Sequence, residues 1–188
     1  MASELQVTTL KGNPTGANAN QILVPTGQKI VGTNAGSIVA PGAVINVVNV
    51  QDGTTYNHAS ATDAGSGIQA SITPTYSNSK ILLIATGVTG SAFTSNFGRG
   101  LWKKSISGGS YTTVGSEFFT GGNFAATYGN RTIEKWSYTY FDSPATTSSI
   151  TYQLFVRVLD GNNMWWGRWG QDVNWTEPTT ITLMEIAQ

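Results

Sequence analysis

The sequence predicts an all-β protein: an antiparallel β-sandwich of jelly-roll type, preceded by an extended N-terminal arm. Short apolar stretches that alternate with polar residues recur from residue 43 to the C-terminus, separated by Gly, Pro, Asn and Asp. No window of about 11 residues carries an apolar stripe at the helical period. The aromatic residues (six Trp, seven Tyr and seven Phe) begin at Tyr56, so the first part of the chain differs sharply in composition.

The N-terminal segment, residues 1–42, is dense in Gly, Asn, Pro and Thr, and its apolar pieces are short: Ile22-Leu23-Val24 and Lys29-Ile30-Val31. Such a segment cannot bury enough apolar surface to offset the entropy lost on ordering. We therefore expect an arm that docks on a partner, namely another protein of a larger particle. The alternative is a mobile tail.

The remaining residues, 43–188, are expected to form the sandwich. Residues 43–50 are rich in β-branched side chains, and residues 68–75 alternate, so both predict strands, with a loop over 51–66. Residues 80–88 are apolar on both faces, as in a strand covered on both sides.

The second half of this region continues the pattern. A turn over residues 107–110 predicts a hairpin, and residues 131–142 alternate, with Trp136, Tyr138 and Tyr140 on one face. Residues 150–159 predict a strong strand. The last strand, residues 179–187, is again apolar on both faces.

The charge content indicates which partners to expect. Only 11% of the residues are charged, against about a quarter in an ordinary soluble chain, and ten Lys and Arg balance ten Asp and Glu. A surface this neutral is typical of a subunit covered by neighbours in an assembly, and equally of a stable β domain of extracellular type whose polar face is Thr and Ser. Without a clustered basic patch or a long apolar run, we expect no nucleic acid and no membrane insertion.

The first residues and the absence of cysteine add two expectations. Met1-Ala2-Ser3-Glu4 lacks the basic and apolar regions of a secretory signal, so we expect synthesis in the cytoplasm. The chain has no cysteine, which excludes disulfides, thiol catalysis and cysteine zinc sites.

The residues available for catalysis are few, so we expect no enzyme, no cofactor and no metal site. The single histidine, His58, lies in a polar loop without a nucleophile motif, which favours a solvated side chain. Residues 160–163 resemble part of a calcium loop but lack its further acids, which favours a hairpin turn. Two of the ten acids could meet as in a glycosidase, and this alternative stays open, although disfavoured.

A tryptophan cluster spans residues 164–175, with Trp165 and Trp169 on one face of a strand and Trp166 on the other. Indole faces beside Asn, Asp and Gln can stack on sugar rings, so Trp165, Trp166, Trp169 and Trp175 are candidate glycan ligands. Tryptophan is equally common in subunit interfaces and cores, and this second interpretation is the favoured one.

Four segments resemble the distal knob domain of tail-fibre and related virion proteins of phages that infect marine bacteria. They are Gly32–Gly42 (GTNAGSIVAPG), Ser71–Ile84 (SITPTYSNSKILLI), Asp142–Leu154 (DSPATTSSITYQL) and Thr180–Ala187 (TITLMEIA). The resemblance spans about residues 30–188. It is absent from residues 90–130 and 164–175, where specificity would vary. It implies a trimeric β knob displayed on a virion that is assembled in the host cytoplasm.

The strands apolar on both faces fit such a trimer. A two-layer sandwich buries one face of each sheet, so the other face of residues 80–88 and 179–187 needs a second cover. We expect that Leu82, Ile84, Met184 and Ile186 lie in a homotrimer interface. The alternative is a monomer in which arm residues 20–50 cover these strands.

Two functions follow as hypotheses. The first is a phage virion structural protein, a short trimeric tail or head fibre whose knob contacts the host surface. The alternative is a capsid decoration or cement protein that stabilises the head without binding a receptor. A depolymerase is disfavoured, because no convincing acid pair or histidine site is present.

Overall fold

The computed structural model describes residues 9–12, 14–17, 22–31, 38–91, 95–123, 132–168 and 176–188, with only the backbone at residues 95, 96, 119–123 and 132. The chain divides into two compact units, Met1–Ile38 and Val39–Gln188. We call the first unit the arm and the second the knob. The division falls shortly before the predicted boundary at residue 42.

The knob is built of strands, and the described residues include no α-helix. The strands are β1 (Val44–Asp52), β2 (Tyr56–His58), β3 (Ala64–Ile72), β4 (Lys80–Ser91), β5 (Ser95–Ile106), β6 (Thr112–Asn123), β7 (Thr132–Asp142), β8 (Ile150–Val158), β9 (Met164–Trp166) and β10 (Thr179–Ile186).

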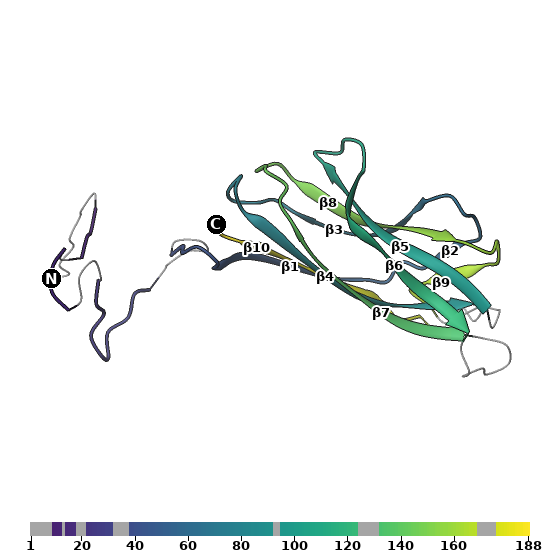
Figure 1. Cartoon of the computed structure of the whole chain (residues 1–188), viewed down its shortest axis with the longest axis horizontal. Coiled ribbons are helices and arrows are strands. Elements are labelled where there is room, and N and C mark those ends of the chain that lie inside the picture. Colours follow the sequence, from purple (N-terminus) through teal and green to yellow (C-terminus); the bar gives the residue numbers. More distant parts are fainter. Residues whose placement is uncertain are drawn as a thin grey trace. The chain divides into compact units, whose positions relative to one another are not determined.

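The strands form two antiparallel sheets that pack face to face (Figure 1). Sheet A has the order β1-β10-β4-β9-β2, with β7 on the other side of β4, and sheet B has the order β3-β8-β5-β6. Counting only the eight long strands in chain order, the sheets read 1-8-3-6 and 2-7-4-5. This is the order of a jelly roll, so the predicted fold class is confirmed.

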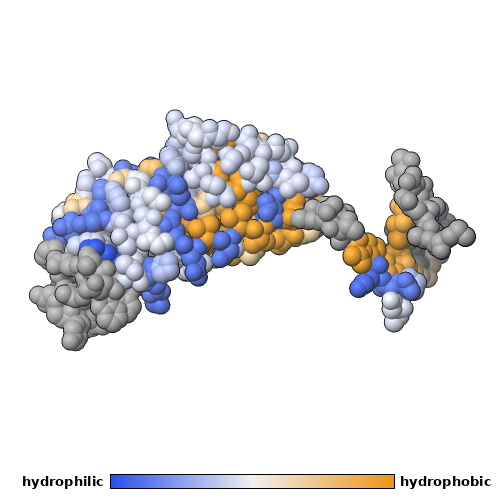
Figure 2. Space-filling model, turned by 180° about the vertical axis from the view of Figure 1, so that it is seen from behind, coloured by the Kyte–Doolittle hydropathy of each residue, from blue (hydrophilic) through white to orange (hydrophobic). Residues whose placement is uncertain are grey.

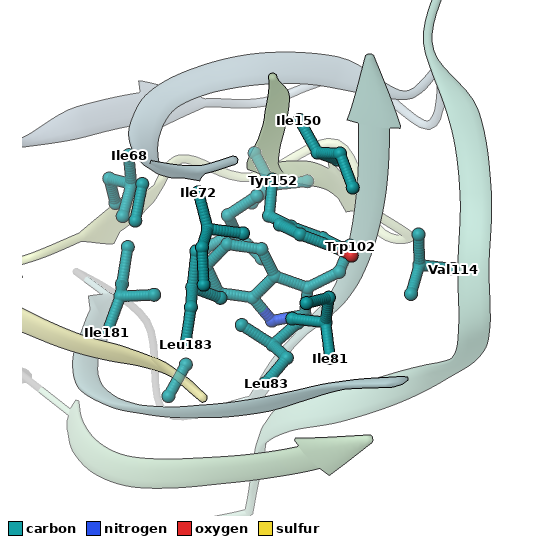
Figure 3. Close-up of a cluster of buried hydrophobic side chains, with 14 of the residues drawn as sticks. Ile68, Ile72, Ile81, Leu83, Trp102, Val114, Ile150, Tyr152, Ile181 and Leu183 are labelled. Carbon is teal, nitrogen blue, oxygen red and sulfur yellow. The ribbon is translucent and has the colours of Figure 1, made fainter. Parts of the chain in front are cut away.

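The core lies between the sheets because every second residue of the long strands points inward. Ile81, Leu83, Ile181 and Leu183 of sheet A face Ile68 and other residues of sheet B, and all of these are fully buried (Figure 3). Each such aliphatic side chain contributes about 1.5–3 kcal/mol to folding. Strands were predicted over residues 68–75 and 150–159; β3 and β8 lie there, and they bury Ile68, Ile72, Tyr152 and Leu154.

Two buried carboxylates hold the end of the sandwich at which β1 begins and β10 ends. Glu185 on β10 has no exposed surface and accepts hydrogen bonds from the backbone and hydroxyl of Thr75 and from the backbone of Tyr76. Asp142 on β7 accepts hydrogen bonds from Lys104 Nζ, 2.7 Å away, and from Tyr152 Oη, 2.8 Å away. Both contacts of Asp142 link the two sheets, because Asp142 lies on sheet A and Lys104 and Tyr152 lie on sheet B.

One predicted loop is partly wrong. Residues 51–66 were expected to have no strand, yet they contain the end of β1, all of β2 and the start of β3. β2 pairs only with the three-residue strand β9, from Tyr56↔Trp166 to His58↔Met164. A strand formed by pairing over three residues leaves too little periodicity for a sequence pattern to reveal it.

Candidate assembly face and the tryptophan cluster

The outer face of sheet A is the candidate functional site. Strand register places its side chains in rows that cross β1, β10, β4 and β7. Three successive rows are Val47–Met184–Leu82–Phe141, Asn49–Thr182–Ile84–Thr139 and Gln51–Thr180–Thr86–Ser137. None of these residues carries a charge. In the register, Lys80 lies beside Ile186 in the next row at one end, and Lys135 follows Ser137 at the other end.

Apolar side chains gather at the end of this face where β1 begins. The predicted interface residues Leu82, Ile84, Met184 and Ile186 all lie here, each half-buried by its neighbours alone. Three more exposed residues, which the sequence analysis did not single out, lie beside them: Val44, Val47 and Phe141, which are 51%, 53% and 54% exposed. We call these seven residues together the apolar patch.

Some of these additional residues could have been found in the sequence. Phe141 lies on the face of residues 131–142 opposite Trp136, Tyr138 and Tyr140, so its outward direction was predictable. Its place beside Leu82 depends on the pairing of β4 with β7 across a wide sequence separation. Figure 2 shows apolar surface, in orange, gathered toward the end of the knob where its chain begins.

The outer face of sheet B is different, because charged side chains cover it. Arg99 Nη1 donates to Glu117 Oε2 at 2.7 Å, and Arg157 also donates to Glu117. Lys103 Nζ donates to Asp63 Oδ2 at 3.0 Å. These side chains are between 18% and 31% exposed, so the network is partly shielded but remains in contact with water.

The first residues of the knob lie at the same end of sheet A as the apolar patch. The backbone N–H of Gly42 donates to the carbonyl of Ala187, and the N–H of Ala187 donates to the carbonyl of Ala43. Within the arm itself, the side chains of Ile22, Leu23, Val24, Ile30 and Val31 are 44–67% exposed. Exposed apolar side chains are thus present in the arm as well as in the patch.

The described half of the tryptophan cluster is buried. Trp165 and Trp166 lie on β9, 5% and 0% exposed. Trp166 packs in the core beside Trp136 and Phe118, and the guanidinium of Arg168 lies over the Trp165 ring at 5.2 Å. A sugar ring can stack only on an open indole face, so these two side chains do not provide the glycan contact considered for them. Trp169 and Trp175 lie outside the described residues.

Two tyrosines have perturbed acidity. Burial, followed by the nearby charge of Asp142, raises the pKa of Tyr152 well above its ordinary value of 10.0. Burial, followed by the influence of Tyr140, also raises the pKa of Tyr138. Both phenols therefore stay protonated at physiological pH and act as hydrogen-bond donors, Tyr152 to Asp142 and Tyr138 to the carbonyl of Val114.

The remaining candidates for chemistry are spread apart. His58, the last residue of β2, has its Nε2 atom 2.9 Å from the carbonyl oxygen of Thr62, in the loop that follows. Among the described residues, no three His, Asp or Glu side chains gather in a way that could hold a metal ion. The same residues contain no helix long and apolar enough to cross a membrane.

Comparisons with known proteins give little. No protein-family model and no curated protein matches the chain. It is similar to a structure of infectious bursal disease virus strain Gt, with 13% identity and a TM-score of 0.40, over 96% of this chain and 47% of that one. It is also similar to a structure of strain Gx, with 11% identity and a TM-score of 0.37, over 76% of this chain and 37% of that one. The chain thus spans less than half of either viral chain, and likenesses this slight carry no argument about function.

Proposed function

We propose that this chain is a structural protein of a phage virion, a short homotrimeric fibre in which the arm binds the particle and the knob faces outward to the host surface. The observation that carries the proposal is the outer face of sheet A, with three rows free of charge and an apolar patch at one end. The resemblance of four segments to marine phage knobs supports the same function. In this proposal, the protein acts by binding the particle and the host surface and does not catalyse a reaction.

The patch supports self-association for a physical reason. A soluble monomer seldom exposes a contiguous apolar area of more than a few hundred Å². Three copies around an axis would bury this area on each chain and would leave the charged face of sheet B in water. A closed symmetric assembly also prevents open-ended pairing of the sheet edges.

Sedimentation velocity of the full chain at micromolar concentration tests the assembly. We expect one species with three times the mass of the chain. A well-folded monomer over this concentration range would contradict the trimer and favour the alternative in which the arm covers the patch within one chain.

Deleting residues 1–40 tests the role of the arm. The exposed apolar residues of the arm, such as Leu23 and Ile30, are its available contacts with another virion protein. We expect the truncated protein to remain a trimer but to be absent from particles. Incorporation at the level of the full chain would show that the arm is not the anchor.

A capsid decoration protein is the second candidate, favoured by the neutral composition and by the same arm. It would share the trimer and the arm contact but would have no affinity for the host. Adsorption of the purified protein to host cells separates the two, since only the fibre should bind. Location on the head or on the tail follows from labelled particles in electron micrographs.

A further inference from the structure

The edge of β1 is a second open feature of sheet A. β1 lies at the edge of the sheet, and β10 is its one partner among the described strands, so half of its backbone N–H and C=O groups point away from β10. After the irregularity near the start of β1, residues 46–51 (NVVNVQ) contain no charge, no glycine and no proline. A regular and neutral edge of this kind can pair with another strand.

The other long edge strands have features that discourage such pairing. β3 is irregular around Gly67 and β6 around Gly115, and both glycines have positive φ angles. β7 carries two adjacent charged residues, Glu134 and Lys135. Bulges and charges are common means of protecting an edge. Residues 46–51 of β1 have neither, so β1 is the long edge strand that accepts a partner most readily.

The core is also incompletely covered beside this edge. Val48 and Val50 pack against the core, yet both stay half-buried. On β3, the edge strand of the opposite sheet, Ile68 and Ile72 are 0% and 2% exposed. A further strand beside β1 would shield the two valines on one face and would lie next to Val47 of the apolar patch on the other. The fitting partner is therefore a short strand with apolar residues on both faces.

The residues directly before β1 do not form this strand. The N–H of Ala43 donates to the carbonyl of Ala40 at 2.9 Å, which closes a tight turn over Pro41 and Gly42. Gly42 has a φ angle of 83°, and the proline ring fixes the φ angle of Pro41 at about −65°, as in a type II turn. Turns of this type splay the two segments that they join, whereas a regular hairpin needs the mirror-image types. The partner of β1 must come from another segment.

One segment of the arm matches the edge. Ile22, Leu23 and Val24 are 50%, 60% and 44% exposed, and residues 12–28 around them contain no charge. In an extended strand, Ile22 and Val24 would point to one face and Leu23 to the other. Pro25 follows directly and lacks the N–H that would continue a ladder, so the strand would end there.

We propose that Ile22-Leu23-Val24 of one copy adds as a strand to the edge of β1 in a neighbouring copy. In this pairing, Ile22 and Val24 lie beside the half-buried Val48 and Val50, and Leu23 lies beside Asn49 on the outer face. Main-chain hydrogen bonds supply the affinity, and the alternating side chains fix the register.

The position of the patch favours a neighbouring copy over the same chain. Val44 and Val47 of β1 belong to the apolar patch, so a trimer built on the patch brings another copy to this edge. Residues 25–43 can span up to about 60 Å when extended, which is enough to cross to a neighbour. When each of three copies gives one arm and receives one, every β1 edge is closed and no edge remains for open-ended pairing.

The inference rests on the proposed trimer and divides the work of the arm. It assigns one segment to a neighbouring copy and leaves other exposed apolar residues, among them Leu10 and Ile30, for the particle. The patch still holds three copies together when the arm is removed, so the exchanged strand adds to the assembly and does not create it.

Disulfide cross-linking tests the contact directly, because the chain has no cysteine of its own. One chain carries Leu23→Cys, a second chain with a different affinity tag carries Asn49→Cys, and the two are co-expressed so that mixed trimers form. Mild oxidation should join the two kinds of chain into a product of twice the chain mass on a non-reducing gel. The matched control uses Ser71→Cys, an exposed position on the edge strand β3, in place of Asn49→Cys. Its yield should be at least about tenfold lower, because a disulfide forms only between closely placed residues.

Hydrogen exchange of the full chain gives a second measurement. The amides of residues 46–51 that point away from β10 should exchange at least about tenfold more slowly than in the double variant Ile22→Asn/Val24→Asn, because the added strand shields them. Ile30→Asn, which leaves the segment unchanged, should keep the full protection. Sedimentation should show a trimer for all three proteins.

Three results would overturn the proposal: no disulfide between the two kinds of chain, an equal yield with Ser71→Cys, or equal exchange in the double variant and the full chain. A chain that carries both Leu23→Cys and Asn49→Cys and closes on itself, at the mass of one chain, would show that the arm covers its own β1. A trimer without the cross-link refutes this inference alone, whereas a folded monomer refutes the proposed trimer as well.

Discussion

The two outer faces of the sandwich belong to the same fold but present different chemistry. On sheet B, two guanidinium groups and an ammonium are paired with two carboxylates, and all of them touch water. On sheet A, twelve side chains in three rows carry no charge, and seven apolar residues gather at one end. Charged groups lose little when they remain hydrated, whereas exposed apolar area is costly.

This difference supports the proposal that sheet A is the face used for contact. A sandwich needs a buried face on each sheet, and both sheets meet that need in the shared core. The additional apolar residues of sheet A lie outside that core. Charge is thus distributed unevenly between the two outer faces of the knob.

Introducing a charge on the outer face of sheet A should have the largest effect on assembly. Leu82→Glu would place a carboxylate in the centre of the apolar patch, where burial against another copy would leave it unpaired at a cost of several kcal/mol. We expect the assembly to dissociate at micromolar concentration while the core stays intact, as measured by sedimentation and by near-ultraviolet circular dichroism.

Gln153→Glu is the matched control, because it adds the same charge to the outer face of sheet B, next to Lys103. It should leave the oligomer unchanged. If both variants dissociate, or if neither does, the two faces do not differ in the way proposed here.

Removing a charge from sheet B should act on stability alone. Arg99 and Arg157 lie directly opposite each other in the strand register, and Glu117 pairs with both. Glu117→Gln removes the anion that holds these two cations. Allowing for their partial exposure, we expect the free energy of unfolding to fall by about 1–2 kcal/mol, measured by urea denaturation. A change in oligomeric state would instead implicate sheet B in assembly.

High pH should lower the stability of the folded protein through Tyr152. The folded protein holds the Tyr152 proton above the pH at which the unfolded chain releases it, so the unfolded state binds fewer protons. The free energy of unfolding should therefore fall as pH rises above about 10, by about 1.4 kcal/mol per pH unit for this residue. Tyr152→Phe should make this decline shallower, and an identical slope in the two proteins would contradict the assignment.

Added salt should have the smallest effect, and it should act differently on the outer faces of the two sheets. Raising the salt concentration from about 0.05 M to about 1 M screens the partly exposed pairs of sheet B, so we expect a loss of less than about 1 kcal/mol in stability. The apolar contact of sheet A should persist or tighten. Dissociation of the oligomer by salt, followed by light scattering, would indicate an electrostatic interface instead.

Much of this fold could be predicted from local patterns. Residues 80–88 and 179–187 were expected to be strands with apolar residues on both faces, and they became β4 and β10 in the centre of sheet A. The hairpin turn over 107–110 was also predicted, and Ser107 and Gly108 have the positive φ angles that a tight turn requires. These features depend only on neighbours in the sequence.

Features that depend on distant pairing could not be predicted in this way. Val47 and Phe141 belong to the patch only because β1 and β7 flank β10 and β4. Trp165 and Trp166 have indole rings that could equally have faced solvent, and their burial depends on β9 pairing with β2 and β4.

The junction of the arm and the knob also has a mechanical consequence. β1 begins two residues after Gly42 and lies at the edge of sheet A, where β10 is its one partner among the described strands. If the arm is held on a particle and the opposite end of the knob on a cell, tension pulls β1 along its own axis. The ladder bonds to β10 then share the load at the same time rather than opening one after another. The pairing of β1 with β10 would therefore resist a force along the strands far better than a force perpendicular to them.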